Sequence, residues 1–179
     1  MSRPDEIRRL AAKARHGDRH AVGELVRATQ AEVWRLCAHL VDRQSADDLT
    51  QETYLRAVRA LGSFRGEAPF RSWLLTIARR TCAAEIDARQ QRRRMLRALP
   101  RPGIVPDHAR RVGLELLLEV LSPEQREAFV LTQLLGCSYA EAAAICECPV
   151  GTVRSRVARA REVLVFAAAG GRLEASPPA

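Results

Sequence analysis

The fold is decided near the C-terminus by a stretch that reads SYAEAAAICECPVGTVRSRVARAR, residues 138–161. Ser138 followed three residues later by Glu141 is the signature of a capping box, which starts a helix. The apolar run after it ends at Glu147, and Pro149 suits the first turn of a second helix, where a missing N–H costs nothing. The stretch therefore predicts two short helices joined by a tight turn.

The second of these helices separates an apolar stripe from a polar face at 100° per residue. The stripe consists of Val150, Val153, Val157, Ala160 and Leu164. The opposite side carries Thr152, Ser155, Arg156 and Arg159, with Arg154 and Arg161 at its edges. This layout is typical of a helix-turn-helix whose second helix enters the DNA major groove. The alternative is a surface helix with a solvated arginine face, but cap, proline, stripe and basic face together favour DNA binding.

Composition and charge point to an anionic partner. The chain has 179 residues, enough for one domain or two small ones, and 47% of them are hydrophobic. Its net charge of +8 favours an anionic partner such as nucleic acid. No apolar segment approaches the ~20 residues that span a bilayer, so a membrane is the less favoured partner. The N-terminus lacks the apolar core of a secretory signal, and we expect a cytoplasmic protein.

The five cysteines make an odd count without disulfide-like spacing. Cys146 and Cys148 form the only close pair, and neither has a histidine or a further cysteine at zinc-finger spacing. We therefore expect buried free thiols that act as small hydrophobic residues. No metal site and no cofactor is predicted.

Helical periodicity runs through the whole chain, and strand signals are nearly absent. Helices are expected at about 4–16, from just after Asp18 to about 40, and at 45–62, 68–94, 113–121 and 123–135, before the helix-turn-helix. Pro100, Pro102, Gly103 and Pro106 form a cluster that no helix can cross. We predict an all-α fold of two small helical domains joined by a Pro-rich linker. The expected ranges are a domain at 1–96, the linker at 97–112, a second domain at 113–169 and a disordered tail at 170–179.

An acidic cluster opens the third expected helix. Asp47 and Asp48 lie in its first turn, where the helix dipole favours negative charge. Asp48 and Glu52 also lie one turn apart on one face, beside Gln51 and Leu55. Three interpretations stay open: the dipole alone, a docking patch for a positively charged protein, or carboxylates that hold magnesium.

A basic segment follows from Arg65 to Arg111, with twelve arginines against four acidic residues. Such density suits contacts with phosphates. Phe64, Phe70 and Trp73 could be stacking platforms for unpaired bases, although Phe70 and Trp73 are more often core anchors. We predict a second DNA-facing surface here.

Four pieces of the chain, in this order, resemble the extracytoplasmic-function (group IV, sigma-70 family) sigma factors of bacterial RNA polymerase. They read SADDLTQETYLRA (45–57), WLLTIAR (73–79), LSPEQREA (121–128) and CPVGTVRSR (148–156), the last followed by RAR (159–161). The resemblance covers roughly residues 5 to 167. Residues 131–136 and the Trp34-Arg35 pair are most similar to actinobacterial members of the sigma C type.

The resemblance implies a role for each segment: binding core RNA polymerase and directing it to promoters. The helix at 47–55 would bind the coiled coil of the β′ clamp, through Asp47, Asp48, Leu49, Gln51, Glu52 and Leu55. The segment at 64–94 would recognise the −10 element, with Phe64, Arg71, Trp73, Arg79 and Arg80 as its site residues. The helix at 149–161 would enter the major groove of the −35 element.

By position in that helix, Arg154, Ser155 and Arg159 would contact base edges, and arginine suits the N7 and O6 acceptors of guanine. Ser138, Tyr139, Thr152 and Arg156 would hold phosphates or orient the helix. The resemblance further implies the β flap as a polymerase contact and an anti-sigma factor as a possible partner. It implies no enzymatic activity, no catalytic residue and no small-molecule substrate.

The chain departs from the family pattern at Arg80, where the family often has asparagine. Ala158 is also small where some members place a bulky residue. A further hypothesis concerns the free protein: an acidic patch near Asp48 and a basic one near Arg154 could let the two domains cover each other.

Two rival functions remain. A stand-alone helix-turn-helix regulator would use residues 122–166 but would leave the acidic patch without a role. A metal-dependent nuclease or integrase-like enzyme would use Asp47, Asp48 and Glu52, but no catalytic triad, phosphate loop or histidine cluster supports it.

Overall fold

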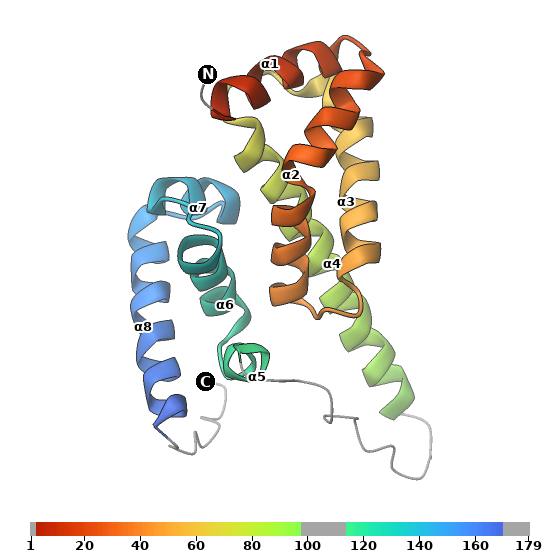
Figure 1. Cartoon of the computed structure of the whole chain (residues 1–179). Coiled ribbons are helices and arrows are strands. Elements are labelled where there is room, and N and C mark those ends of the chain that lie inside the picture. Colours follow the sequence, from red (N-terminus) through yellow and green to blue (C-terminus); the bar gives the residue numbers. More distant parts are fainter. Residues whose placement is uncertain (1–2, 98–113, 170–179) are drawn as a thin grey trace.

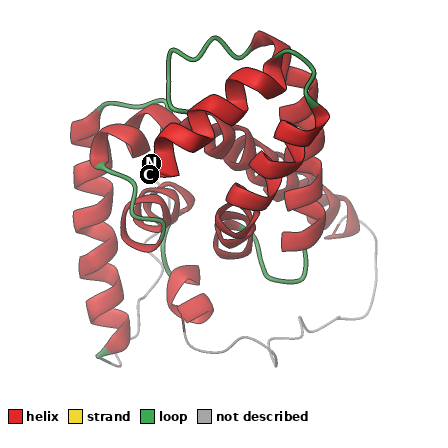
Figure 2. Cartoon of the chain, turned by 45° about the horizontal axis from the view of Figure 1, so that its top comes forward, coloured by secondary structure: helices red, strands yellow, loops and turns green. Residues whose placement is uncertain are grey.

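The computed structural model describes residues 3–97 and 114–169, and every regular element in these ranges is a helix (Figure 2). The all-α prediction is therefore confirmed. In chain order the elements are α1 (Arg3–Arg15), α2 (Arg19–Leu40), α3 (Ala46–Ala60), η1 (Leu61–Ser63), α4 (Phe70–Arg97), α5 (Leu114–Glu119), α6 (Pro123–Phe129), η2 (Val130–Leu134), α7 (Tyr139–Cys146) and α8 (Val150–Ala168). The predicted linker, apart from Arg97, and the predicted tail lie outside the described residues.

In the first half of the chain, α2, α3 and α4 pack side by side and α1 crosses one end of them (Figure 1). Asp18 caps α2 as expected, because its Oδ1 accepts a hydrogen bond from the Ala21 N–H at 3.1 Å. The interior is aliphatic: Val33 and Leu36 of α2 and Leu74 of α4 are almost completely buried. The few buried polar side chains include Thr29, Thr53 and Thr81, whose hydroxyls donate to backbone carbonyls one turn earlier. This close-packed core fixes the relative positions of the helices that carry the acidic cluster and the basic segment.

The start of α3 is held by a network rather than by a simple cap. The Ser45 side chain makes no capping hydrogen bond; instead, its backbone N–H donates to Asp42 Oδ1 at 2.8 Å. Arg89 of α4 donates to Asp42, to the Ser45 hydroxyl and, at 2.6 Å, to Glu85. The acidic end of α3 is thereby tied to α4 by charge-assisted bonds.

The second half contains α5 to α8. Ser122 and Gln125 form the expected capping box, with hydrogen bonds of 3.3 and 3.2 Å. The helix expected over 123–135 is not uniform, because it ends in the π-helical turn η2, where the Leu135 N–H donates to the Val130 carbonyl at 3.0 Å. Such a turn depends on how the backbone accommodates its packed side chains, and no local sequence signal marks it.

The helix-turn-helix forms as predicted. Ser138 and Glu141 make a reciprocal capping box at the start of α7, with bonds of 3.2 and 2.8 Å. The turn passes through Glu147, which has a φ of 55°, and Pro149 is the N-cap of α8 rather than part of its first turn. The stripe of α8 is buried at Val153, Val157 and Ala160, whereas Val150 lies at its exposed edge.

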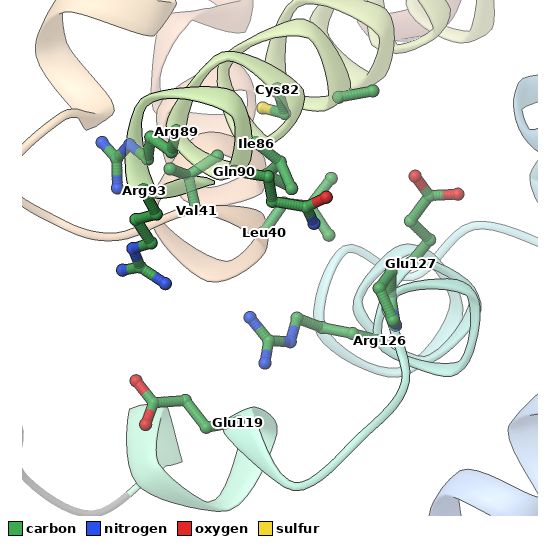
Figure 3. A pocket seen from close by; sticks show the side chains of 12 residues that line it. Leu40, Val41, Cys82, Ile86, Arg89, Gln90, Arg93, Glu119, Arg126 and Glu127 are labelled. Carbon is green, nitrogen blue, oxygen red and sulfur yellow. The ribbon is translucent and has the colours of Figure 1, made fainter. Parts of the chain in front are cut away.

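The two halves touch mainly where α7 lies against α4 and η2 lies against α2. Farther along α4 they separate around a cavity of about 230 Å³. Figure 3 shows Arg89, Gln90 and Arg93 of α4 on one side of it, and Glu119 and Arg126 from the second half on the other. The contact between the halves is therefore incomplete along α4.

Candidate nucleic-acid and polymerase interfaces

The predicted base-reading residues share the solvent-facing side of α8. Arg154, Ser155 and Arg159 are exposed, while the buried stripe faces α6 and α7. The Arg154 guanidinium lies 5.9 Å from the centre of the Tyr139 ring, which is within cation–π range. The guanidinium groups of Arg154 and Arg159 face solvent, whereas the Ser155 hydroxyl donates to the Thr152 carbonyl at 2.9 Å.

The residues predicted to hold phosphates differ in how available their side chains are for a contact with DNA. The Ser138 hydroxyl is already used, since it accepts from the Glu141 N–H in the capping box. The half-buried Arg156 points toward the protein, with its Nη1 3.8 Å from Cys148 Sγ. Thr152 is half-buried at the start of α8. These side chains fit an orienting role better than a freely accessible one.

The acidic cluster of α3 is largely open to solvent. Asp48 and Gln51 are exposed, and Leu55 is 48% exposed one turn farther on. Leu49 does not share this exposed face, because its side chain is 7% exposed and packs in the core. A helix residue one position after Asp48 turns by 100°, which takes Leu49 to the packed side.

Two α3 carboxylates have partners. Asp47 accepts a hydrogen bond from Trp34 Nε1 at 2.8 Å, and Glu52 pairs with Arg56 at 2.7 Å. The sequence did not predict the Trp34–Asp47 hydrogen bond. It singled out Trp34 only as part of the Trp34-Arg35 pair that resembles the family. This bond helps to fix Asp47 beside the surface that Asp48 occupies.

The three aromatic residues of the basic segment form one cluster. The ring centres of Phe64 and Phe70 lie 5.6 Å apart, and those of Phe64 and Trp73 lie 5.0 Å apart. Phe70 is buried, whereas Phe64 and Trp73 are half-buried. Phe70 is therefore a core anchor, and the other two keep accessible ring surface at the start of α4.

The Arg71 side chain lies between the two halves of the chain. It donates to Glu32 from Nε at 2.8 Å and to the Leu135 carbonyl from Nη2 at 2.7 Å, and its Nη1 lies 3.8 Å from Glu141. Although burial opposes its charge, the bond to Glu32 and the nearby negative groups raise the Arg71 pKa. Through these contacts Arg71 connects α4 with α2 and α7.

Arg79 and Arg80, two predicted −10 residues, also contact the second half. Arg79 lies 3.5 Å from Glu127 and 3.1 Å from Glu147, and Arg80 forms an ion pair with Glu147. Burial raises the Glu127 pKa, an effect opposed by the nearby Arg79 and Arg156. The charges at this contact are the reverse of those hypothesised, with arginines on the first half and carboxylates on the second.

The described residues hold no group of three or more metal-ligating side chains. Cys37, Cys82, Cys137 and Cys146 are buried free thiols, and Cys148 is a half-buried one. No helix within 3–97 or 114–169 combines the length and the apolar character needed to cross a membrane.

Comparison with known proteins identifies both halves. The sigma-70 region 2 family matches residues 25–95, and the sigma-70 region 4 family matches residues 111–164. A probable RNA polymerase sigma-C factor of Mycobacterium bovis and the ECF sigma factor SigC of Mycobacterium tuberculosis are each 50% identical over 169 residues, which cover 90% of both chains. The ECF sigma-E factor of Escherichia coli is 34% identical over 173 residues, covering 87% of this chain and 90% of that one.

Solved structures agree. CnrH, in complex with the cytosolic domain of CnrY, matches with a TM-score of 0.75 and 28% identity, over 93% of this chain and 99% of CnrH. RpoE of Bartonella quintana, in complex with the anti-sigma factor NepR, matches with a TM-score of 0.70 and 29% identity, over 84% and 98% of the chains.

The chain belongs to the extracytoplasmic-function sigma factors of the sigma-70 family. It directs RNA polymerase to promoters for transcription initiation and is not an enzyme. The stand-alone regulator and the metal-dependent nuclease are thus set aside, and the predicted sigma-factor function is confirmed.

Proposed function

We propose that three separate surfaces divide the work of this sigma factor. The exposed face of α3 around Asp48, Gln51 and Leu55 binds core polymerase at the β′ clamp. Phe64 and Trp73, together with Arg71, Arg79 and Arg80, contact the −10 element. Arg154, Ser155 and Arg159 read the −35 element. One observation supports this division of roles among separate surfaces: Asp48 and Arg159 are both exposed, on different helices in different halves of the chain.

The proposal for α3 rests on charge and exposure. Its acidic face lies on a protein of net charge +8 and combines carboxylates with the exposed apolar side chains of Leu55 and Val58. An apolar centre with charged neighbours is the composition of a specific protein contact. We expect Asp47 and Glu52 to contribute from the rim, since both already have partners.

The experiment is a transcription assay with purified core RNA polymerase and a promoter library. The intact chain should start transcripts downstream of a shared two-part motif. Asp48→Arg should abolish initiation and also binding to core polymerase in a pull-down, because it places a cation where the partner is basic. Glu24→Arg, on the exposed side of α2, is the control and should retain both. Failure of the intact chain to initiate would contradict the proposal, as would full core binding by Asp48→Arg.

We also propose the β flap as a contact of the region 4 half and an anti-sigma factor as a further partner. The first is supported by exposed Leu116 and Val120 on and just after α5 and by Phe166 on α8. The second is supported by two similar structures, which are complexes with CnrY and NepR. The site of action would be the cytoplasm, where bacterial polymerase transcribes.

A further inference from the structure

We propose that Tyr139 is a positioning residue for promoter recognition, whose aromatic ring holds the Arg154 guanidinium at the DNA-facing side of the helix-turn-helix. The inference rests on the proposed function, under which Arg154 reads a base pair of the −35 element. It gives the Tyr139 ring a role in base preference, beyond the phosphate contact or general orienting role predicted from the sequence.

The two residues belong to different helices that meet at one end. Tyr139 is the first residue of α7, and Arg154 lies near the start of α8. Because α7 packs against α8 at this end, the two side chains come together (Figure 1). The Arg154 guanidinium carbon lies over the Tyr139 ring, 5.9 Å from its centre. At this distance the negative face of the ring attracts the cation.

The Tyr139 ring is a firm support for a long side chain. The residue before it, Ser138, caps α7 in a reciprocal box with Glu141, which fixes the backbone at Tyr139. The ring itself is half-buried and packs against the hydrophobic core. An exposed arginine loses rotamer freedom when it is ordered. A ring that is already fixed by the fold lets Arg154 lose part of that freedom before DNA binds.

The contact leaves the hydrogen-bond donors of Arg154 unused. Its side chain is exposed and forms no ion pair with a carboxylate in residues 3–97 or 114–169. A carboxylate would occupy N–H groups in the plane of the guanidinium, whereas an aromatic face attracts the cation without taking them. Bidentate recognition of guanine needs two such donors at once. Tyr139 therefore orders Arg154 and keeps its donors available to a base.

Arg159 provides a contrast within the same helix. It is also exposed and is also predicted to read a base. Within the described part of the chain, however, aromatic rings contact the guanidinium groups of Arg43 and Arg154 and not that of Arg159. Loss of the Tyr139 ring should thus affect the base pair that Arg154 reads and spare the one that Arg159 reads.

The expected effect is modest. A cation–π contact at an exposed site corresponds to a change of about two- to fivefold in the population of the ordered side chain. Replacing the ring should therefore weaken the preference for the favoured base by about two- to fivefold. A phosphate contact through the Tyr139 hydroxyl would instead support all sequences alike, because phosphates carry no sequence information.

The test uses holoenzyme reconstituted from core RNA polymerase and the full chain, with initiation measured on promoters that differ at single −35 base pairs. Tyr139→Leu removes the ring, and Tyr139→Phe keeps the ring but removes the hydroxyl. Arg154→Ala identifies the base pair that Arg154 reads. Each preference is a ratio of initiation rates within one preparation, so a smaller fraction of folded protein does not change it.

Tyr139→Leu should reduce the preference at the Arg154 base pair by about two- to fivefold, and Tyr139→Phe should retain it. In an Arg154→Ala background, Tyr139→Leu should cause no further loss at that base pair. In an Arg159→Ala background its effect should persist in full, because Arg159 does not share the contact.

An unchanged preference in Tyr139→Leu would overturn the inference. An equal loss in Tyr139→Phe would also overturn it, since the effect would then belong to the hydroxyl. A full additional loss in the Arg154→Ala background would show that the ring acts independently of Arg154, which contradicts the inference as well. If Arg154→Ala alters no −35 position, the proposed reading by Arg154 is wrong and the inference falls with it; the other outcomes leave that reading intact.

Discussion

The two arginine-rich helices, α4 and α8, use the same residue type in opposite ways. On α8, Arg154 and Arg159 are exposed on the face opposite a buried valine stripe. On α4, Arg79 and Arg80 are paired with carboxylates from the other half of the chain. The difference shows that availability for DNA depends on the neighbours of an arginine as much as on the helix that carries it.

The largest expected loss of stability comes from a charge placed in the buried stripe of α8. Val157→Asp places an unpaired carboxylate at a position that is 1% exposed, which should cost about 3–5 kcal/mol of unfolding free energy. Ala158→Asp, its exposed neighbour, should cost no more than about 0.5 kcal/mol. Urea unfolding monitored by circular dichroism measures both, and equal losses would contradict the assignment of the stripe.

The next effect concerns the exposed arginines of α8. Arg159→Ala should lose about 1–3 kcal/mol of binding to the preferred −35 duplex and relax the preference at one base pair. Arg161→Ala is the control, because Arg161 donates to Gln133 at 2.7 Å and lies outside the predicted reading face. Competition binding with single-base variants of the duplex measures the preference, and unchanged selectivity in Arg159→Ala would remove this residue from the reading face.

The cap of α7 sets the geometry of the turn between α7 and α8. Ser138→Ala removes the oxygen that accepts from the Glu141 N–H and should lower the unfolding free energy by about 1 kcal/mol. Ser155→Ala, in the middle of α8, should leave stability nearly unchanged. Thermal unfolding of the two variants compares them, and an equal Tm would show that the capping box adds nothing measurable.

The smallest effect is a pH dependence that separates two carboxylates of the second half. Burial raises the Glu127 pKa, so the unfolding free energy of the wild type should fall relative to Glu127→Gln as the pH rises above about 4.5. Hydrogen bonds from Ser138 lower the Glu141 pKa, so the stability of the wild type relative to Glu141→Gln should instead be lost as the pH falls below about 4.5. Slopes of the same sign would contradict these environments.

Local signals predicted much of this fold. The capping boxes at Ser122 and Ser138 and the valine stripe of α8 depend on residues three or four positions apart, and each lies where the sequence placed it. The family motifs supplied the function, which spacing alone left open between a sigma factor and a stand-alone regulator.

Such local signals did not predict the contacts between segments that lie far apart in the sequence. Arg79 and Glu147 are 68 residues apart. The sequence contains several carboxylates that could pair with an arginine of α4, and it did not single out Glu147. The π-helical turn η2 and the burial of Leu49 within an acidic surface helix depend on packing in three dimensions. For that reason the predicted charges of the contact between the halves were reversed.

The central claim is that the two halves read different parts of one promoter, and a promoter-library transcription assay with core polymerase tests it most directly. The intact chain, Arg159→Ala and Arg80→Ala are compared by the sequence motif of the transcripts that each one starts. We predict that Arg159→Ala alters only the upstream element and Arg80→Ala only the downstream one. If both variants alter the same element, or if neither alters the motif, the division of promoter recognition between α8 and α4 is wrong.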